Sequence, residues 1–359
     1  MNESTPEGQA IETSEATQPA LPDTLEELLA LGQRCLDARN FGEAQRAFER
    51  ALTLDPANVT ARHNLGYALE CQGTIEGAIA AYEAVVKGPT PLVQSAFNLG
   101  VLLARSGRTD EAWQAFEQTL ERDPTFAQAW VNLGVLHVRA GQLEQARQCY
   151  GQALEADSSC HSARLKLANL LARERRWEEA SAAYARLVEE GWNLAEVQYR
   201  RALALAAHGD EDEAIQACER ALETDPDHVF ARLQLALLYA QRERYDQATE
   251  TLQRAADVAP ADARVQYNLG NMHARQAVEG GELVNYGYAD AAIRAYRRAI
   301  ELNPQLFKAY YNLACVAEKL SAQEGITAWE DYLNVARDVP FEQEWVVKAR
   351  RYMRDLKGD

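Results

Sequence analysis

Apolar residues recur three and four positions apart through most of the chain, as in Phe97, Val101 and Ala104. This spacing places them on one face of an α-helix, so it predicts amphipathic helices. Turn signals interrupt the pattern, and in two of them Gly107 and Gly141 can take the left-handed conformation that ends a helix. The chain is therefore predicted to consist of helices joined by tight turns.

The helical pattern repeats with a period of 34 residues. Four prolines lie at whole multiples of this period from one another: Pro56, Pro124, Pro226 and Pro260. An Asn-Leu-Gly triplet recurs in phase with them and ends at Gly66, Gly100, Gly134 and Gly270. Because proline cannot continue a helix, each proline marks the end of one repeat.

Small residues occupy one fixed position of every repeat, where two helices must approach closely. They are Gly32, Gly66, Gly100, Gly134, Ala168, Ala202, Ala236, Gly270 and Ala314. An alanine follows twelve residues later in most repeats, and in the first five an aromatic residue lies four beyond it: Phe48, Tyr82, Phe116, Tyr150 and Tyr184. Nine small positions predict nine helix pairs.

This arrangement resembles the tetratricopeptide repeat family over roughly residues 25–340. The resemblance implies that each repeat is a pair of antiparallel helices with small residues at the crossing. The expected fold is all-α, a right-handed α-solenoid or superhelix of about nine such pairs. Solenoids need a cap over their last apolar face, and the charged segment after the ninth repeat is expected to supply a C-terminal capping helix.

The repeat pattern divides the chain into three parts. Residues 1–22 are acidic and nearly devoid of large apolar side chains, which predicts a disordered tail. Residues 23–340 form the superhelix. Its eighth repeat is ten residues too long and carries an insertion at about 276–287, expected to be a lengthened first helix and a loop. Residues 341–359 form the capping helix.

Composition and charge narrow the class of protein. The net charge is −17, so phosphate backbones should be repelled and nucleic acid is not expected as a partner. No apolar run is long enough for a membrane span, which argues against direct membrane insertion. The amino terminus lacks a basic cluster followed by an apolar stretch, and the six cysteines form no C-x-x-C pair, so a cytoplasmic protein with reduced thiols is expected.

No motif for catalysis, metal or cofactor binding is found in the sequence. The chain lacks a phosphate-binding G-x-x-x-x-G-K-[ST] loop, a G-x-S-x-G elbow and an H-E-x-x-H helix. Cys160 and His161 would need further ligands to bind a metal, and they are better explained as a pair at a repeat boundary. We therefore expect a protein that is not an enzyme and has no catalytic residues, metal or cofactor.

One row of side chains is polar in eight consecutive repeats. These residues, which we call the inner polar row, stand two positions before the small residue: Asn64, Asn98, Asn132, Lys166, Arg200, Gln234, Asn268 and Asn312. The row resembles the asparagines that bind peptide backbones inside tetratricopeptide superhelices. A carboxamide both donates and accepts hydrogen bonds, so such a row can bind successive peptide groups. The alternative is that these side chains only cap or bridge neighbouring helices.

Positions beside the row are apolar, aromatic or cationic. The further candidates for a peptide-binding concave face are Tyr67, Phe97, Asn169, Tyr199, Tyr267 and Asn271, together with Arg105, Arg139, Arg173 and Arg275. With Lys166, Arg200 and Arg264 these arginines make seven cations on the inner face, against a single acid, Glu196. Arginine binds carboxylates bidentately, so an acidic peptide is the expected ligand. The alternative is a solvated face whose charges balance nearby acids.

The sequence thus favours a protein-interaction adaptor or scaffold. It would bind an extended acidic segment or C-terminal tail of a partner protein in its concave groove. The alternative is a structural subunit that assembles with itself or a larger complex through its convex face or the insertion, with its own acidic N-terminal tail in the groove. A shortened chain that starts near Asp23 would distinguish the two.

Overall fold

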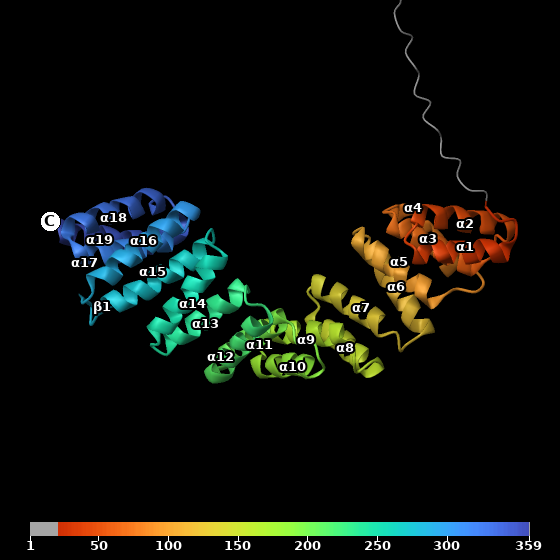
Figure 1. Cartoon of the computed structure of the whole chain (residues 1–359), viewed down its shortest axis with the longest axis horizontal. Coiled ribbons are helices and arrows are strands. Elements are labelled where there is room, and N and C mark those ends of the chain that lie inside the picture. The colour runs from red at the N-terminus through yellow and green to blue at the C-terminus, as the bar shows by residue number, and fades with distance from the viewer. Residues whose placement is uncertain (1–20, 359) are drawn as a thin grey trace, which may run out of the picture. The chain divides into compact units, whose positions relative to one another are not determined.

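The computed structural model describes residues 21–358, and almost all of them are helical. Helices follow one another in antiparallel pairs, which confirms the all-α solenoid predicted from the sequence (Figure 1). The described residues contain nine pairs followed by one further helix, α19. Of the expected disordered tail, residues 1–22, the first twenty lie outside the described residues. Leu21, which belongs to the expected tail, packs against the first helices.

The chain divides into two compact units, one ending at Ser158 and the other beginning at Ser159. The first unit contains α1 Leu25–Asp37, α2 Phe41–Leu54, α3 Val59–Cys71, α4 Ile75–Val86, α5 Val93–Arg105, α6 Thr109–Arg122, α7 Ala127–Arg139 and α8 Leu143–Ala156. The second unit contains α9 His161–Arg173, α10 Trp177–Glu189, α11 Ala195–His208, α12 Glu211–Thr224, α13 Val229–Gln241, α14 Tyr245–Val258, α15 Ala263–Ala277, α16 Tyr286–Leu302, α17 Phe307–Leu320, α18 Ala322–Ala336 and α19 Gln343–Lys357. No helix among residues 21–358 is long and apolar enough to cross a lipid bilayer.

In five repeats the small residue is a glycine that faces an aromatic ring of the following helix. A Cβ atom added to Gly100 would lie 2.7 Å from the Phe116 ring, and one added to Gly270 would lie 2.5 Å from the Tyr296 ring. Gly134 stands in the same relation to Tyr150. Since contacts this close are sterically forbidden, glycine is what lets the two helices of the pair approach, as the sequence pattern predicts.

The insertion in the eighth repeat contains a β-hairpin where sequence analysis expected a loop. Its strands, β1 Val278–Glu279 and β2 Glu282–Leu283, pair antiparallel. The two residues between them, Gly280 and Gly281, have φ angles of 60° and 89°. Two consecutive positive φ angles are what a tight type I′ hairpin turn requires, and glycine adopts them without strain. The first helix is lengthened to 15 residues, against 13 in most other repeats.

Helix α19 follows a short 3-10 helix, Pro340–Glu342, and packs on α18. Val346 and Ala349 are buried in this contact. The segment also leaves two aromatic side chains in contact with solvent, since Phe341 is 72% exposed and Trp345 is 43% exposed. The segment that sequence analysis treated as a charged cap therefore also offers an aromatic surface.

Candidate functional site

The inner polar row lies on the first helices of successive pairs. In the first unit it comprises Asn64 on α3, Asn98 on α5 and Asn132 on α7. In the second unit it comprises Lys166 on α9, Arg200 on α11, Gln234 on α13, Asn268 on α15 and Asn312 on α17. The five asparagines and the glutamine are half-buried, whereas the lysine and arginine are exposed. Half-burial leaves part of each carboxamide accessible to a ligand.

Among the residues that the structure describes, a single row asparagine of the first unit has an internal hydrogen-bond partner. Asn98 donates through Nδ2 to the Tyr82 hydroxyl at 3.2 Å and accepts from Gln94 at 2.9 Å. Within residues 21–358, the side chains of Asn64 and Asn132 make no hydrogen bond. Asn98 therefore bridges neighbouring helices, as the alternative interpretation of the row expects. The carboxamides of Asn64 and Asn132 keep all their hydrogen-bond donors and acceptors available for a ligand.

The remaining candidates of the first unit differ in accessibility. Tyr67 is 43% exposed, and Arg139 is exposed with no ion-pair partner in the described part of the chain. Phe97 instead packs against the rings of Phe116 and Phe126, with centroids 5.9 Å and 4.9 Å away. Its contacts are those of a packing residue at the edge of the core.

Arg105 forms an ion pair with an acid that sequence analysis missed. Its Nη1 lies 3.4 Å from Glu70 Oε1. Counting Glu196 as the single acid on the inner face was therefore wrong. The missed signal is the position six residues beyond the inner polar row, which holds Glu70 after Asn64 and Glu318 after Asn312.

Asn169 and Arg200 are joined in the second unit. Asn169 Oδ1 accepts a hydrogen bond from the Tyr184 hydroxyl at 2.6 Å and a longer one from Arg200 at 3.5 Å. Arg200 also forms an ion pair with Glu196 at 2.6 Å, so its charge is already balanced. Burial raises the pKa of Tyr184 to about 12, which keeps its hydroxyl protonated as a donor.

Two other cations of this face lack such partners in the described part of the chain, whereas Arg264 forms an ion pair with Asp262 at 2.6 Å. Lys166 and Arg173 are exposed and make no ion pair with any residue in 21–358. Tyr199 is half-buried beside His228, with ring centroids 5.2 Å apart. Next to it Phe230 is 47% exposed and stacks under the Arg264 guanidinium at 4.7 Å. Tyr199, Phe230 and Arg264 therefore lie next to one another.

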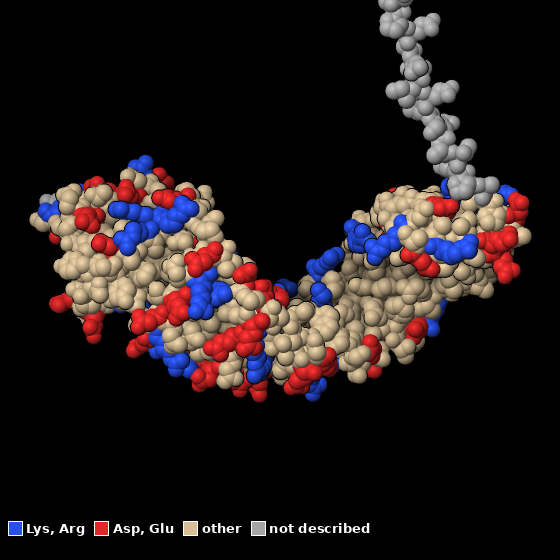
Figure 2. All heavy atoms as spheres, viewed as in Figure 1, with Lys and Arg blue, Asp and Glu red and all other residues tan. Residues whose placement is uncertain are grey.

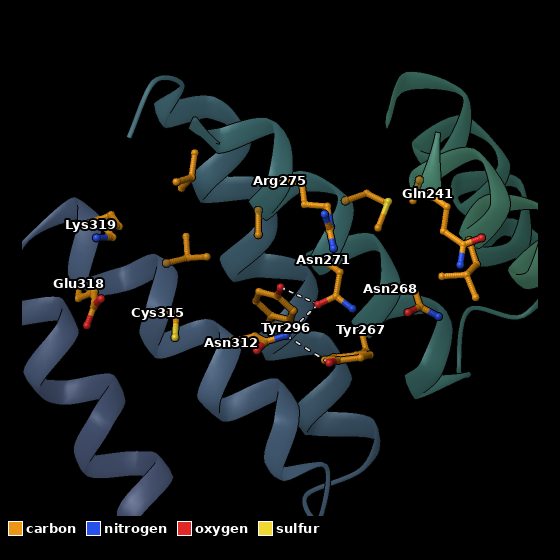
Figure 3. A pocket seen from close by; sticks show the side chains of 16 residues that line it. Gln241, Tyr267, Asn268, Asn271, Arg275, Tyr296, Asn312, Cys315, Glu318 and Lys319 are labelled. Carbon is orange, nitrogen blue, oxygen red and sulfur yellow. Dashed lines mark hydrogen bonds between the residues drawn. The ribbon is translucent and has the colours of Figure 1, made fainter. Parts of the chain in front are cut away.

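Five candidates of the second unit come together in a single pocket of about 730 Å³ (Figure 3). They are Tyr267, Asn268, Asn271, Arg275 and Asn312. We call this cavity the groove pocket. Its wall also includes residues that sequence analysis did not select, among them Leu237, Gln241, Val278, Cys315, Glu318 and Lys319. Val278 belongs to the hairpin, so the insertion helps to form the site.

Hydrogen bonds fix the orientation of two carboxamides in the groove pocket. Asn271 Oδ1 accepts from the Tyr296 hydroxyl and from Asn312 Nδ2, both at 2.9 Å. Asn312 Nδ2 also donates to the Tyr267 hydroxyl at 3.2 Å. These bonds, dashed in Figure 3, use the oxygen of Asn271 and the amino group of Asn312. The Asn271 amino group and the Asn312 oxygen remain for a ligand, one as donor and the other as acceptor.

The groove pocket has two cations with no ion-pair partner within residues 21–358, Arg275 and Lys319. Its one acid, Glu318, already accepts a hydrogen bond from Trp329 Nε1 at 3.0 Å. Burial raises the pKa of Cys315 to about 12, so this thiol is neutral. The unbalanced charge in the pocket is therefore positive.

A second cavity of about 240 Å³ adjoins the first, and we call it the end pocket. Its lining residues are Tyr267, Lys308, Tyr311, Asn312, Glu342 and Trp345. Tyr267 and Asn312 line both cavities. The 34-residue period does not predict Trp345 at this position, because α19 lies outside the repeats.

The charges of the molecule as a whole are mixed. Figure 2 shows acidic and basic side chains interspersed on the visible face of each unit. No group of three or more His, Cys, Asp or Glu residues within 21–358 is placed to hold a metal ion. The features that stand out at the site are carboxamides, aromatic rings and unpaired cations.

Comparison with family models identifies the fold family. Three models described as tetratricopeptide repeat match the chain, one at residues 103–162 and 205–270, one at 29–91 and 133–195, and one at 282–306. Together these ranges cover more than half of the sequence. The chain belongs to the tetratricopeptide repeat family, whose members generally serve as protein-interaction scaffolds.

Solved structures with the same architecture are similar in fold only. The pilF protein of Pseudomonas aeruginosa aligns with a TM-score of 0.51 at 20% identity, covering 60% of this chain and 97% of that one. A tetratricopeptide repeat protein from Parabacteroides merdae gives 0.49 at 19% identity over 69% and 98%. YrrB, described as having an unusual peptide-binding site, gives 0.45 at 22% identity over 54% and 95%. No curated protein matches the sequence.

Proposed function

We propose that this protein is a non-catalytic adaptor or scaffold that binds an extended acidic segment of a partner protein. The segment, internal or a C-terminal tail, lies in the groove pocket of the second unit. The observation that carries the proposal is the fixed pair formed by Asn271 and Asn312 beside two unpaired cations. An extended concave surface built from repeated helices is the usual binding surface of such proteins.

The donor and acceptor left free in the groove pocket match the needs of a peptide group. The Asn271 amino group can donate to a peptide carbonyl, and the Asn312 oxygen can accept from a peptide N–H. These contacts do not depend on the ligand's side chains, so they bind backbone in general. Because the two carboxamides are already held by Tyr296 and Tyr267, little orientational entropy is lost on binding.

Arg275 and Lys319 supply the preference for acidic side chains. Both lack an internal ion pair among the described residues, so a carboxylate from the partner would be their first charged contact. Charge-assisted hydrogen bonds of this kind are stronger than neutral ones. Lys166 and Arg173, exposed and also without an ion-pair partner in residues 21–358, extend the same preference along first helix α9.

Affinity capture tests the proposal. Wild-type protein is compared by quantitative mass spectrometry with the charge-reversal variant Lys166→Glu, Arg275→Glu. The control, Arg186→Glu, Arg220→Glu, makes the same charge change at exposed positions on second helices α10 and α12. We expect partners that are captured by the wild type and the control but not by the groove variant. Identical partner sets from all three proteins would contradict groove binding.

A further inference from the structure

The end pocket is lined by three aromatic rings from three helices and by Lys308, Asn312 and Glu342. Tyr267 comes from α15, Tyr311 from α17 and Trp345 from α19. Its volume, about 240 Å³, is below the roughly 300–1,000 Å³ of sites that take whole drug-sized molecules. A cavity of this size and composition suits one large apolar side chain.

Tyr311 of the end pocket is held in place by contacts with neighbouring aromatic rings. Tyr311 packs edge-on against Trp345 with centroids 5.1 Å apart. It also contacts the buried rings of Trp329 at 5.0 Å and Tyr332 at 5.6 Å. Because Tyr311 is fixed by this cluster, the aromatic wall exists before any ligand binds, and binding orders few side chains.

The rim of the end pocket carries one cation and one acid, so its formal charges balance. Lys308 is exposed and has no ion-pair partner within residues 21–358. Glu342, the acid of the pocket, already accepts a hydrogen bond from the Tyr332 hydroxyl at 2.8 Å. Because Lys308 has no ion-pair partner among the described residues, a carboxylate beside the entering apolar side chain would be placed to bind it.

The two pockets share a wall, so one ligand can occupy both. Asn312 and Tyr267 line each of them. The hydrogen bond of 3.2 Å that joins these two residues is dashed in Figure 3. A peptide whose backbone binds Asn271 and Asn312 in the groove pocket would have its next side chains beside Trp345 and Lys308. From the groove pocket to the end pocket, the lining residues therefore change from carboxamides to aromatic rings and then to a cation.

We propose that the end pocket binds a large apolar side chain, aromatic or leucine-like, of the same partner segment that binds the groove pocket. The partner motif then combines an apolar anchor, seated between Tyr267, Tyr311 and Trp345, with flanking acids that contact Lys308 on one side and Arg275 or Lys319 on the other. This assignment rests on the proposed function, because it assumes that a peptide lies in the groove pocket.

Short fluorescein-labelled Gly-Ser peptides, acetylated and amidated, test the assignment. Each peptide of the main set contains one leucine or phenylalanine and two glutamates at successive spacings. A second set replaces the apolar residue with serine, and a third replaces the glutamates with glutamine. Fluorescence anisotropy measures their binding to the full chain, to Trp345→Ala and to the control Phe341→Ala. Phe341 is 72% exposed and lines neither pocket.

At least one spacing should bind the wild type about tenfold more tightly than its serine counterpart, since a large apolar side chain is removed from water. Trp345→Ala should abolish this difference without weakening the serine peptides, and Phe341→Ala should preserve it. Should Trp345→Ala lose helix α19, as judged by circular dichroism, Lys308→Glu provides the second test. It should weaken the apolar and acidic peptides about tenfold.

Two failures can be told apart. Equal binding of the apolar and serine peptides, with both lost in Arg275→Glu, would overturn the end pocket assignment and leave groove binding in place. The same holds if Trp345→Ala keeps the preference for the apolar residue. If no peptide of any set binds, or if binding ignores Arg275→Glu, both the assignment and the proposed function fail.

Discussion

The Tyr296 hydroxyl donates a hydrogen bond to Asn271 Oδ1 at 2.9 Å and thereby connects the helix crossing to the groove pocket. The ring of Tyr296 is the one that packs against Gly270, so one side chain both forms the crossing and orients the carboxamide. Tyr184 does the same for Asn169 at 2.6 Å. In these repeats the orientation of the groove asparagines therefore depends on tyrosine rings packed in the core.

Removing this hydroxyl should affect both stability and binding. Tyr296→Phe keeps the packing but leaves Asn271 Oδ1 with Asn312 as its one donor within residues 21–358. We therefore expect about 1 kcal/mol of lost unfolding free energy and weaker peptide binding. The control is Tyr288→Phe, because the Tyr288 hydroxyl has no hydrogen-bond partner within residues 21–358. Urea unfolding measures the first effect. Equal losses in both variants would contradict a role for the hydroxyl.

Two glycines of the first unit should respond oppositely to alanine. A Cβ on Gly134 would overlap the Tyr150 ring, so Gly134→Ala should destabilise the protein by roughly 1–3 kcal/mol. Gly151 lies within α8 and a Cβ there meets no atom within 4 Å, so Gly151→Ala should stabilise it by roughly 0.5–1 kcal/mol. Denaturant midpoints compare the two variants. A neutral Gly134→Ala would show that the crossing is not close.

His63 should make the stability depend on pH. Its Nδ1 lies 2.7 Å from Ser95 Oγ, and burial lowers its pKa below the ordinary 6.5. As the pH falls through 6.5, the unfolded chain takes up the proton before the folded protein does. The contribution of neutral His63 is therefore complete above that pH and is lost as the pH falls toward the folded pKa.

The measurement is the free energy of unfolding between about pH 8 and about pH 5.5 for the wild type and His63→Gln. The wild type should lose more stability than the variant over this range. His208→Gln, at an exposed position, controls for the loss of an imidazole. Parallel curves for the wild type and His63→Gln would refute the argument.

Salt should weaken partner binding. Arg275, Lys319 and Lys166 are accessible cations, so their attraction to an acidic segment is screened as ionic strength rises. Once capture has identified the segment, titration of the synthetic peptide at low and high salt measures the change. We expect a lower affinity at high salt and a smaller salt dependence in Arg275→Glu. An affinity that rises with salt would indicate apolar binding alone.

Much of the fold follows from the sequence because one physical constraint repeats. The 34-residue period places Gly134 opposite Tyr150, and the same offset predicts the contacts of Gly32 with Phe48, Gly66 with Tyr82 and Gly100 with Phe116. The hairpin at Val278 breaks the period, so helical periodicity could not find it. The informative signal was the Gly280-Gly281 dipeptide, which permits the tight turn.

The candidate site was predicted less completely. The inner polar row identified Asn268 and Asn312, which do lie together in the groove pocket. The hydrogen bond from Tyr296, however, depends on the position of its hydroxyl group in three dimensions. Sequence spacing does not predict that position. Trp345 joins the end pocket through the packing of α19 on α18, which no repeat pattern specifies.

The central claim is that the partner binds in the groove pocket. Site-specific photocrosslinking tests this claim most directly. A benzophenone amino acid replaces Gln241, which is exposed in the wall of the groove pocket, or Gln216, which is exposed on second helix α12. After irradiation in native lysate, crosslinked partners are identified by mass spectrometry. We predict an acidic partner segment crosslinked at position 241 and absent at 216. Crosslinking to the same partner at 216 and none at 241 would contradict the account.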